Sequence, residues 1–305
     1  MELDYLLIDV FTDRPFGGSR LTHFPGPVDL PARLMQDLAQ EMGCGETSFV
    51  VSRDGSDRGR LRVFTPSVEI PAAGHAVLGA TFACHHLDDA GAAERRGEAQ
   101  ERFVWELEGG ASCVETLAAV TGRLYNLVLE RPVFLGQYYN RARVARALDL
   151  PESEIAITGL PCEVISTGLP THVVPLASLE AVEAAKLRRG EADAIARELG
   201  FGDLFVFTTE TRDPEAAVHC RMFAPYFGIP EDPASGAATG ALAAYIVKHR
   251  LLKFRDSVRF VSEQGLEIGR PSRLLVDADV EAGVAVRVRV GGHCVLVGRG
   301  TIHLP

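Results

Sequence analysis

Two stretches of the chain repeat each other, and this repetition constrains the fold more than any other feature. Residues 62–83 read RVFTPSVEIPAAGHAVLGATFA, and residues 221–245 read RMFAPYFGIPEDPASGAATGALAAY. Five residues of the first stretch recur 159 positions later, namely Arg62, Phe64, Pro66, Ile70 and Pro71. After an insertion of three residues, Gly74 matches Gly236 and Ala76 matches Ala238. The repeat is too long for a solenoid and predicts two related domains, with two unrelated strand–turn–helix units as the alternative.

Each stretch is typical of a strand, a turn and then a helix of small apolar residues. The helices expected over 74–86 and 236–250 have little polar surface, which favours burial inside a sheet. The first N–H groups of such a helix have no partner within the helix, and a carboxylate there gains about 0.3–1 kcal/mol. If the two helix starts converge on one cleft, they predict a site for a small carboxylate-bearing substrate. The residues expected to bind it are Gly74, Ala76, Ser235, Gly236 and Ala237.

The rest of the chain contains more strand patterns than helix patterns, with few strand–helix–strand alternations. We therefore predict an α+β fold of two similar domains, each a curled, mainly antiparallel sheet or barrel around a central helix. The active site is expected in the cleft between them. The predicted domains are residues 1–122 with a returning C-terminal strand over 292–305, and residues 123–291.

Composition narrows the classes of partner. The net charge of -10 argues against nucleic acid, because phosphate binding needs a basic face. No apolar run approaches the roughly 18–20 residues of a membrane span, and the N-terminus reads as a strand rather than a signal peptide, so we expect a cytoplasmic protein. The six cysteines form no C-x-x-C pair, which favours free thiols. No P-loop, G-x-G-x-x-G or metal-ligand spacing occurs, so neither a cofactor nor a metal is predicted.

Three residues are candidates for proton transfer. Glu46 stands between Gly45 and an apolar strand, where partial burial is expected to raise its pKa toward neutral. His75 begins the first small-residue helix, where the helix dipole favours a neutral imidazole. Asp232 lies in the turn before the second helix. From the residues alone, an exposed strand-start acid, a helix-start histidine bonded to backbone and a turn-capping acid remain open alternatives.

Six segments, spread in order over nearly the whole chain, resemble one family. They are residues 9–18 (DVFTDRPFGG), 45–50 (GETSFV), 64–66 with Gly74-His75 (FTP, GH), 166–170 (STGLP), 231–236 (EDPASG) and 269–273 (GRPSR). The chain resembles the phenazine-biosynthesis PhzF-like isomerases, which share the diaminopimelate-epimerase fold of two domains. This resemblance is specific for fold and superfamily and less so for substrate.

The resemblance implies roles for the three candidates. The family's catalytic glutamate, histidine and aspartate fall on Glu46, His75 and Asp232, which would make the chain a cofactor-free isomerase that shuttles a proton. It also suggests a homodimer. Two departures, Ser19-Arg20 in place of Asn-Pro and Ala237 in place of a hydroxyl residue, point away from the phenazine precursor but not from proton transfer.

Two alternatives to this hypothesis belong to different classes. One is a catalytically inactive protein of the same fold that binds a small molecule or regulates. The other is an epimerase or racemase with two facing thiols, which we disfavour because no cysteine stands at either helix start and the nearest are Cys84 and Cys220.

Overall fold

The computed structural model describes residues 1–55, 57–88, 101–119, 122–201, 203–225 and 229–304. The chain divides into two compact units, Met1–Val128 with Gly291–Pro305 (unit 1) and Leu129–Val290 (unit 2). In unit 1, the C-terminal strand β18 (Cys294–His303) pairs antiparallel with the first strand, β1 (Glu2–Val10). None of the helices in these ranges is long and apolar enough to cross a membrane.

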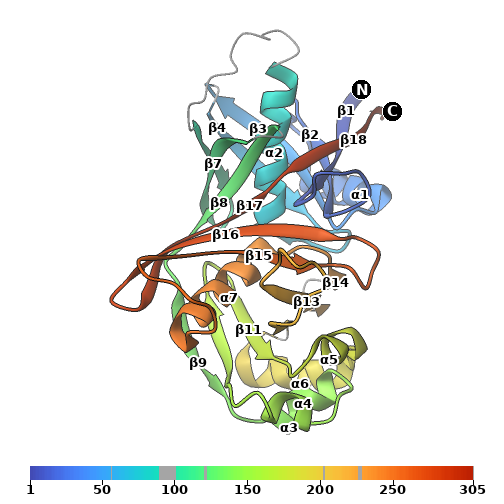
Figure 1. Ribbon diagram of the computed structural model, residues 1–305. Coiled ribbons are helices and arrows are strands. Elements are labelled where there is room, and N and C mark those ends of the chain that lie inside the picture. Colours follow the sequence, from blue (N-terminus) through green and yellow to red (C-terminus); the bar gives the residue numbers. More distant parts are fainter. Residues whose placement is uncertain (56, 89–100, 120–121, 202, 226–228, 305) are drawn as a thin grey trace. The chain divides into compact units, whose positions relative to one another are not determined.

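Unit 1 is a curled sheet around one helix. Its other elements are β2 (Ser19–Phe24), α1 (Ala32–Met42), β3 (Glu46–Asp54), β4 (Arg58–Phe64), β5 (Glu69–Ile70), α2 (Gly74–Asp88), β6 (Glu101–Leu107), β7 (Gly110–Ala119) and β8 (Gly122–Leu129). Helix α2 contacts β1, β2, β3, β7 and β18, so the strands surround it, as Figure 1 shows. Its apolar residues point in all directions, which suits a helix inside a sheet. Helix α1 instead packs its apolar face, with Met35 and Leu38, against Phe24, Phe49 and Phe64.

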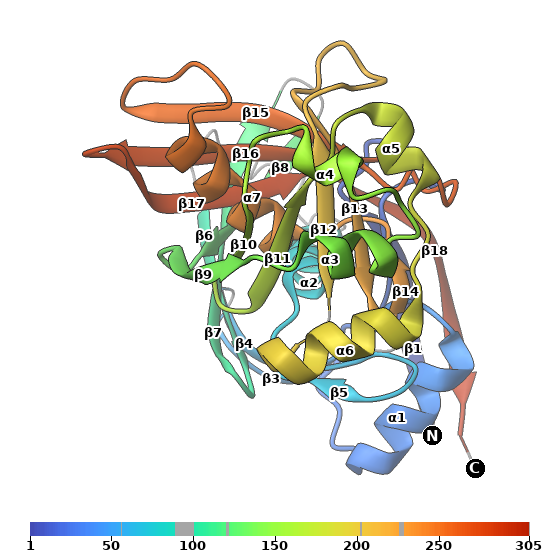
Figure 2. The same cartoon turned by 90° about the horizontal axis from the view of Figure 1, so that it is seen from below.

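Unit 2 repeats this design and adds helices. Its elements are β9 (Val133–Tyr138), α3 (Arg141–Ala147), α4 (Ser153–Ala156), β10 (Cys162–Ser166), β11 (Pro170–Pro175), α5 (Leu179–Ala184), α6 (Arg189–Leu199), β12 (Leu204–Thr208), β13 (Val218–Ala224), β14 (Ile229–Asp232), α7 (Gly236–His249), β15 (Ser257–Gln264), β16 (Ser272–Glu281) and β17 (Val284–Gly292). Helix α7 contacts β10, β11, β15 and β16. A second core gathers apolar residues of α3–α6 against β10–β13, and Figure 2 shows α3 and α6 side by side.

The pairing of strands is the same in both units. In unit 1, β1–β2, β3–β4, β4–β5 and β6–β7 are antiparallel, whereas β2–β3 and β4–β6 are parallel. In unit 2, β10–β11, β12–β13, β13–β14 and β15–β16 are antiparallel, whereas β11–β12 and β13–β15 are parallel. The central helix follows a short strand in each case, β5 in unit 1 and β14 in unit 2, so α2 corresponds to α7. The predicted α+β class with two similar, mainly antiparallel units around central helices is confirmed.

One detail of the repeat differs from the sequence prediction. The strand pairs Val63–Ile70 and Met222–Asp232 are equivalent, because position 222 lies at the repeat spacing from position 63. Ile70 therefore corresponds to Asp232, not to Ile229, and Pro71 corresponds to Pro233. The three inserted residues precede β14 rather than follow Pro230. Ile229-Pro230 matches Ile70-Pro71 in sequence only, because strand pairing and not residue identity fixes the register.

Candidate active site

Glu46 is the first residue of β3 and is held there by the end of α1. The helix ends at Gly43, whose left-handed backbone (φ 61°) reverses the chain while its N–H donates to the carbonyl of Ala39. Three residues later, Glu46 enters the sheet beside Leu21 of β2. The next four residues of β3 are fully or nearly fully buried. The strand therefore fixes the backbone of a glutamate whose side chain is only 9% exposed.

His75 is the second residue of α2 and faces Glu46. Its Nε2 lies 3.2 Å from Oε2 of Glu46, and its side chain is 8% exposed. Helix α2 packs on β2 and β3, and this packing brings the helix start to the strand start. Gly74, which precedes His75, sits against Leu127 so closely that an added Cβ would come within 3.2 Å of its methyl carbon. Unit 1 thus assembles two of the three predicted catalytic residues into one buried pair.

The imidazole of this pair is neutral. Burial lowers the pKa of His75 to about 3, because a buried imidazolium loses its hydration. Near neutral pH the ring therefore carries one proton and one lone pair. Its Nε2 can donate a hydrogen bond to an ionised Glu46 or accept one from the protonated acid, according to the tautomer. The pair can hold a proton or release it without creating a second charge.

Asp232 ends β14 in unit 2 and shapes the turn that leads into α7. Its Oδ1 accepts a hydrogen bond from the N–H of Ala234 at 3.2 Å, and its side chain is partly exposed. This hydrogen bond is typical of a turn formed by an Asp-Pro sequence. The neighbouring Glu231 is instead tied to Arg221 through two hydrogen bonds of 2.9 and 2.8 Å. Asp232 therefore accepts a backbone hydrogen bond within this turn, whereas Glu231 is paired with Arg221.

The start of α7 combines the remaining predicted residues of unit 2. Ser235 precedes the helix in an extended conformation and makes no side-chain cap, and the first turn contains no acidic residue. Gly236 is buried, and Ala237 is partly exposed. The hydroxyl of Thr167, from the turn between β10 and β11, donates to the carbonyl of Ala237 at 3.0 Å. In unit 1, Ala76, the counterpart of Ala238, is fully buried.

The structure also reveals a counterpart of Glu46 that the sequence analysis missed. Asp203 immediately precedes β12, as Glu46 opens β3, and it is 3% exposed. Helix α6 ends at Gly200 in the left-handed conformation, as α1 ends at Gly43. The signal was present in the sequence, because Gly43-Cys44-Gly45-Glu46 and Gly200-Phe201-Gly202-Asp203 share the pattern Gly-x-Gly-acid. Unit 2 thus carries an acid at the place of Glu46, but Ala237 at the place of His75.

The thiols do not lie where a two-thiol epimerase needs them. Ala73 and Ser235 directly precede the helix-start glycines. Cys84 is buried within α2, and Cys220 lies in β13, where burial raises its pKa to about 12 and keeps it a thiol. All six cysteines are free. Over the described ranges, no group of three or more His, Cys, Asp or Glu side chains is placed to hold a metal ion.

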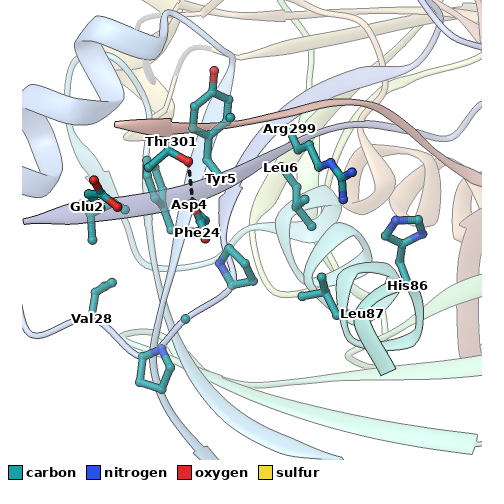
Figure 3. A pocket seen from close by; sticks show the side chains of 15 residues that line it. Glu2, Asp4, Tyr5, Leu6, Phe24, Val28, His86, Leu87, Arg299 and Thr301 are labelled. Carbon is teal, nitrogen blue, oxygen red and sulfur yellow. Dashed lines mark hydrogen bonds between the residues drawn. The ribbon is translucent and has the colours of Figure 1, made fainter. Parts of the chain in front are cut away.

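A groove of unit 1 lies elsewhere on the surface. It has a volume of about 720 Å³ and is formed by β1, β18, the connection after β2 and the end of α2. Figure 3 shows its aromatic and charged side chains, among them Tyr5, Phe24, His86 and Arg299, and the hydrogen bond from Thr301 to Asp4. Neither Glu46 nor His75 lines this groove, so it is distinct from the buried pair.

Comparison with known proteins identifies the family. The model of the PhzC-PhzF family, described as phenazine biosynthesis-like protein, matches residues 8–300. The trans-2,3-dihydro-3-hydroxyanthranilate isomerase of Pseudomonas fluorescens is 32% identical over 306 residues, which cover 99% of each chain.

Solved structures of known proteins resemble this chain in fold. A PhzF-family phenazine biosynthesis protein of Bacillus anthracis matches with a TM-score of 0.86 at 26% identity, covering 100% of both chains. A hydroxyproline epimerase of Agrobacterium vitis shares the fold alone, with a TM-score of 0.60 at 14% identity over 99% of this chain and 92% of its own. The chain belongs to the phenazine biosynthesis-like PhzC-PhzF family of isomerases.

Proposed function

We propose that this protein is a cofactor-independent isomerase that moves a proton from one carbon to another on a small carboxylate-bearing metabolite. The observation that carries the proposal is the 3.2 Å approach of His75 Nε2 to Glu46 Oε2 at the joined starts of β3 and α2. A positioned carboxylate is a suitable general base and acid, and such catalysis contributes about 10²–10⁴ in rate.

The proposed step needs only a base that becomes an acid. Ionised Glu46 removes a proton from a substrate carbon, and the electron pair of that C–H bond moves into the adjacent unsaturated system. Protonated Glu46 then returns the proton to a different carbon, where a new C–H bond forms. Atoms and electrons balance within the substrate, so no oxidant or second substrate is required. Neutral His75 would hold the Glu46 carboxyl in place by a hydrogen bond in both states.

The start of α7 is our candidate for binding the substrate carboxylate. Its first N–H groups have no partner within the helix, and neither a side-chain cap nor an acidic residue of its first turn occupies them. Gly236 and Ala237 would contribute backbone donors there and Ser235 its hydroxyl, and Gly74 and Ala76 would contribute backbone donors at α2. Asp232 would place or protonate the substrate. These assignments of Asp232 and the helix starts are proposals supported by local geometry and family resemblance.

The first substrate to test is trans-2,3-dihydro-3-hydroxyanthranilate, because a relative with 32% identity over the full chain is named for it. The assay is solvent-deuterium exchange followed by NMR, with this compound and a panel of small unsaturated or hydroxylated carboxylic acids. We expect deuterium to enter a carbon position with the wild-type protein. Glu46→Gln should slow that incorporation by about 10²–10⁴-fold, because the amide cannot accept the proton.

Glu115→Gln is the matched control, since Glu115 lies in the same unit and is as buried as Glu46, at 7% exposure. It should retain exchange. Exchange that persists in Glu46→Gln would contradict the proposed mechanism. Ala237 motivates the inactive binding protein as the second candidate, which predicts that panel compounds bind while the wild-type protein incorporates no deuterium.

A further inference from the structure

The turn that carries Asp232 is held by a buried glutamine of another strand. Gln264, the last residue of β15, is completely buried. Its Nε2 donates to the backbone carbonyl of Asp232 at 2.7 Å. Its Oε1 accepts from the N–H of Ser235 at 3.4 Å. One amide therefore joins both ends of the Asp232–Ser235 turn, from the proposed catalytic acid to the residue before α7.

Ser272 supports the same turn from β16. Its hydroxyl lies 2.8 Å from the carbonyl of Pro233 and 2.9 Å from that of Arg270, and it can donate to either. Gly265 makes this approach possible. A Cβ at that position would lie 2.7 Å from the Pro233 carbonyl oxygen, and its φ of +77° favours glycine. Side chains of β15 and β16 thus reach two consecutive carbonyls of the turn, those of Asp232 and Pro233.

Unit 1 lacks this polar support at the equivalent turn. The strand pairs Gly59–Trp105 and Val218–Ser262 are equivalent, which places Leu107 at the position of Gln264. The turn at Pro71, which corresponds to Pro233, receives a backbone hydrogen bond of 2.9 Å from Gly109 instead. Unit 1 also has Ile70 where unit 2 has Asp232. Unit 1, which has no acid at the position of Asp232, therefore also has no glutamine at the position of Gln264.

We propose that Gln264 is a positioning residue that sets the place of the Asp232 carboxylate for proton transfer, with Ser272 in a supporting role. This inference rests on the proposed function, because it assigns Gln264 a part in the reaction through Asp232. Small displacements of a catalytic group can cost about 100-fold in rate, so a clamp on the backbone of Asp232 is expected to act on kcat rather than on KM.

The test is a double-mutant cycle on the full-length protein. Gln264→Met keeps the side-chain volume and removes both hydrogen bonds, and Asp232→Asn removes the acid. Rates of solvent-deuterium incorporation into the best substrate of the panel are measured for the wild type, both single variants and the double variant. Gln137→Met is the control, because Gln137 also lies in unit 2 and donates one hydrogen bond, to Glu163, away from this turn.

We expect Gln264→Met to lower kcat about tenfold or more with KM changed by less than about twofold. In the Asp232→Asn background the same substitution should change kcat by less than about twofold, because nothing remains to position. Gln137→Met should change kcat little in either background. Ser272→Ala serves as the second variant if Gln264→Met does not fold, with a smaller loss of kcat that again disappears in Asp232→Asn.

Two results would overturn the inference in different ways. Equal losses of kcat in both backgrounds, or full activity of a folded Gln264→Met protein, would show that Gln264 serves only the fold. Full activity of Asp232→Asn would remove the proposed role of Asp232 and the clamp with it. Neither result touches the Glu46 assignment, which the exchange assay with Glu46→Gln tests separately.

Discussion

Arg221 of β13 repeats in unit 2 the contacts that Arg62 of β4 makes in unit 1. Arg62 donates two hydrogen bonds to Glu69, and Arg221 donates two to Glu231. Each guanidinium also lies over the phenylalanine two residues later, at 5.2 Å for Phe64 and 4.8 Å for Phe223. Both pairs join a long strand to the short strand that leads into the central helix, β4 to β5 in unit 1 and β13 to β14 in unit 2.

The two arginines should differ in their effect on stability. Arg221 and Glu231 are 8% and 11% exposed, and Arg221 also donates to the carbonyls of Val182 and Ala185. Arg221→Met leaves a buried carboxylate uncompensated, so we expect a loss of about 3–5 kcal/mol in the free energy of unfolding. Arg62 and Glu69 are about one quarter exposed, and Arg62→Met should cost about 1 kcal/mol or less. Urea denaturation measures both, and equal losses would contradict this ranking.

His219 should stabilise the protein at acidic and neutral pH. Burial opposes its charged form, but hydrogen bonds of 2.7 Å to Glu267 and to Glu263 outweigh burial and raise its pKa. A raised folded-state pKa contributes stability that is complete below about 6.5, the unfolded value, and is lost as pH rises through the folded value.

His219→Gln should therefore destabilise the protein more at pH 6 than at pH 9 by urea denaturation. The charged neighbours are Glu263, Glu267 and Arg221, whose Nε lies 3.9 Å from Glu267. A loss that is the same at both pH values would rule out a protonated His219.

His172 should have the opposite effect. It is fully buried in β11, edge-on to Tyr138, and burial lowers its pKa to about 4. Below about pH 6.5 the unfolded chain binds a proton that the folded protein does not, so stability falls by about 1.4 kcal/mol per pH unit for such a group until pH reaches the folded value.

His172→Leu removes this penalty and leaves no buried ring nitrogen without a partner at that site. Relative to the wild type, the variant should gain about 2 kcal/mol between pH 7.5 and pH 5. Unfolding by urea at the two pH values gives the comparison. If the difference between variant and wild type does not change with pH, His172 is not a buried neutral group.

Much of the fold could be predicted because several residues with the same structural role are identical in the two halves of the chain. Arg62 and Arg221 each neutralise a glutamate, and Gly74 and Gly236 each start a helix, so these residues persist in both halves. The all-round apolar character of the two helices also indicated their central place. Glu46 and His75 were candidates for proton transfer from the residues alone, and the family resemblance favoured this role for Glu46 over that of an exposed strand-start acid. Their direct contact was not predicted.

Other features had no signal in the sequence or a misleading one. The register of β14 was misplaced because Ile229-Pro230 imitates Ile70-Pro71, whereas strand pairing aligns Asp232 with Ile70. Gln264 was missed because its partners are backbone groups of Asp232 and Ser235, and a side chain that bonds to backbone leaves no pattern in its partner's identity. The predicted homodimer stays a prediction, which sedimentation of the purified protein would test.

His75 should be required for rate without shaping the pH profile. Its pKa of about 3 keeps the ring neutral from pH 5 to pH 9, so it should contribute no limb to the dependence of kcat on pH in that range. His75→Ala should lower kcat about 10–100-fold through loss of the 3.2 Å contact of its Nε2 with Glu46, while the pH dependence keeps its shape. A lost limb between pH 5 and pH 8 in His75→Ala would show that the histidine titrates there.

Ala237 is the residue that we expect to limit the range of substrates. It corresponds to His75 of unit 1, lies in the first turn of α7 and is partly exposed. The family resemblance places a hydroxyl residue there, and one added hydrogen bond to a substrate is worth about 1 kcal/mol. Ala237→Ser should therefore raise kcat/KM for trans-2,3-dihydro-3-hydroxyanthranilate about fivefold, with unfolding free energy unchanged within about 0.5 kcal/mol.

Ala241→Ser, at a fully buried position of the same helix, is the control and should only lower stability. If kcat/KM is the same with alanine and serine at position 237, the hydroxyl makes no contact with this substrate, and the difference in substrate range must come from other residues, with Ser19-Arg20 the next pair to replace.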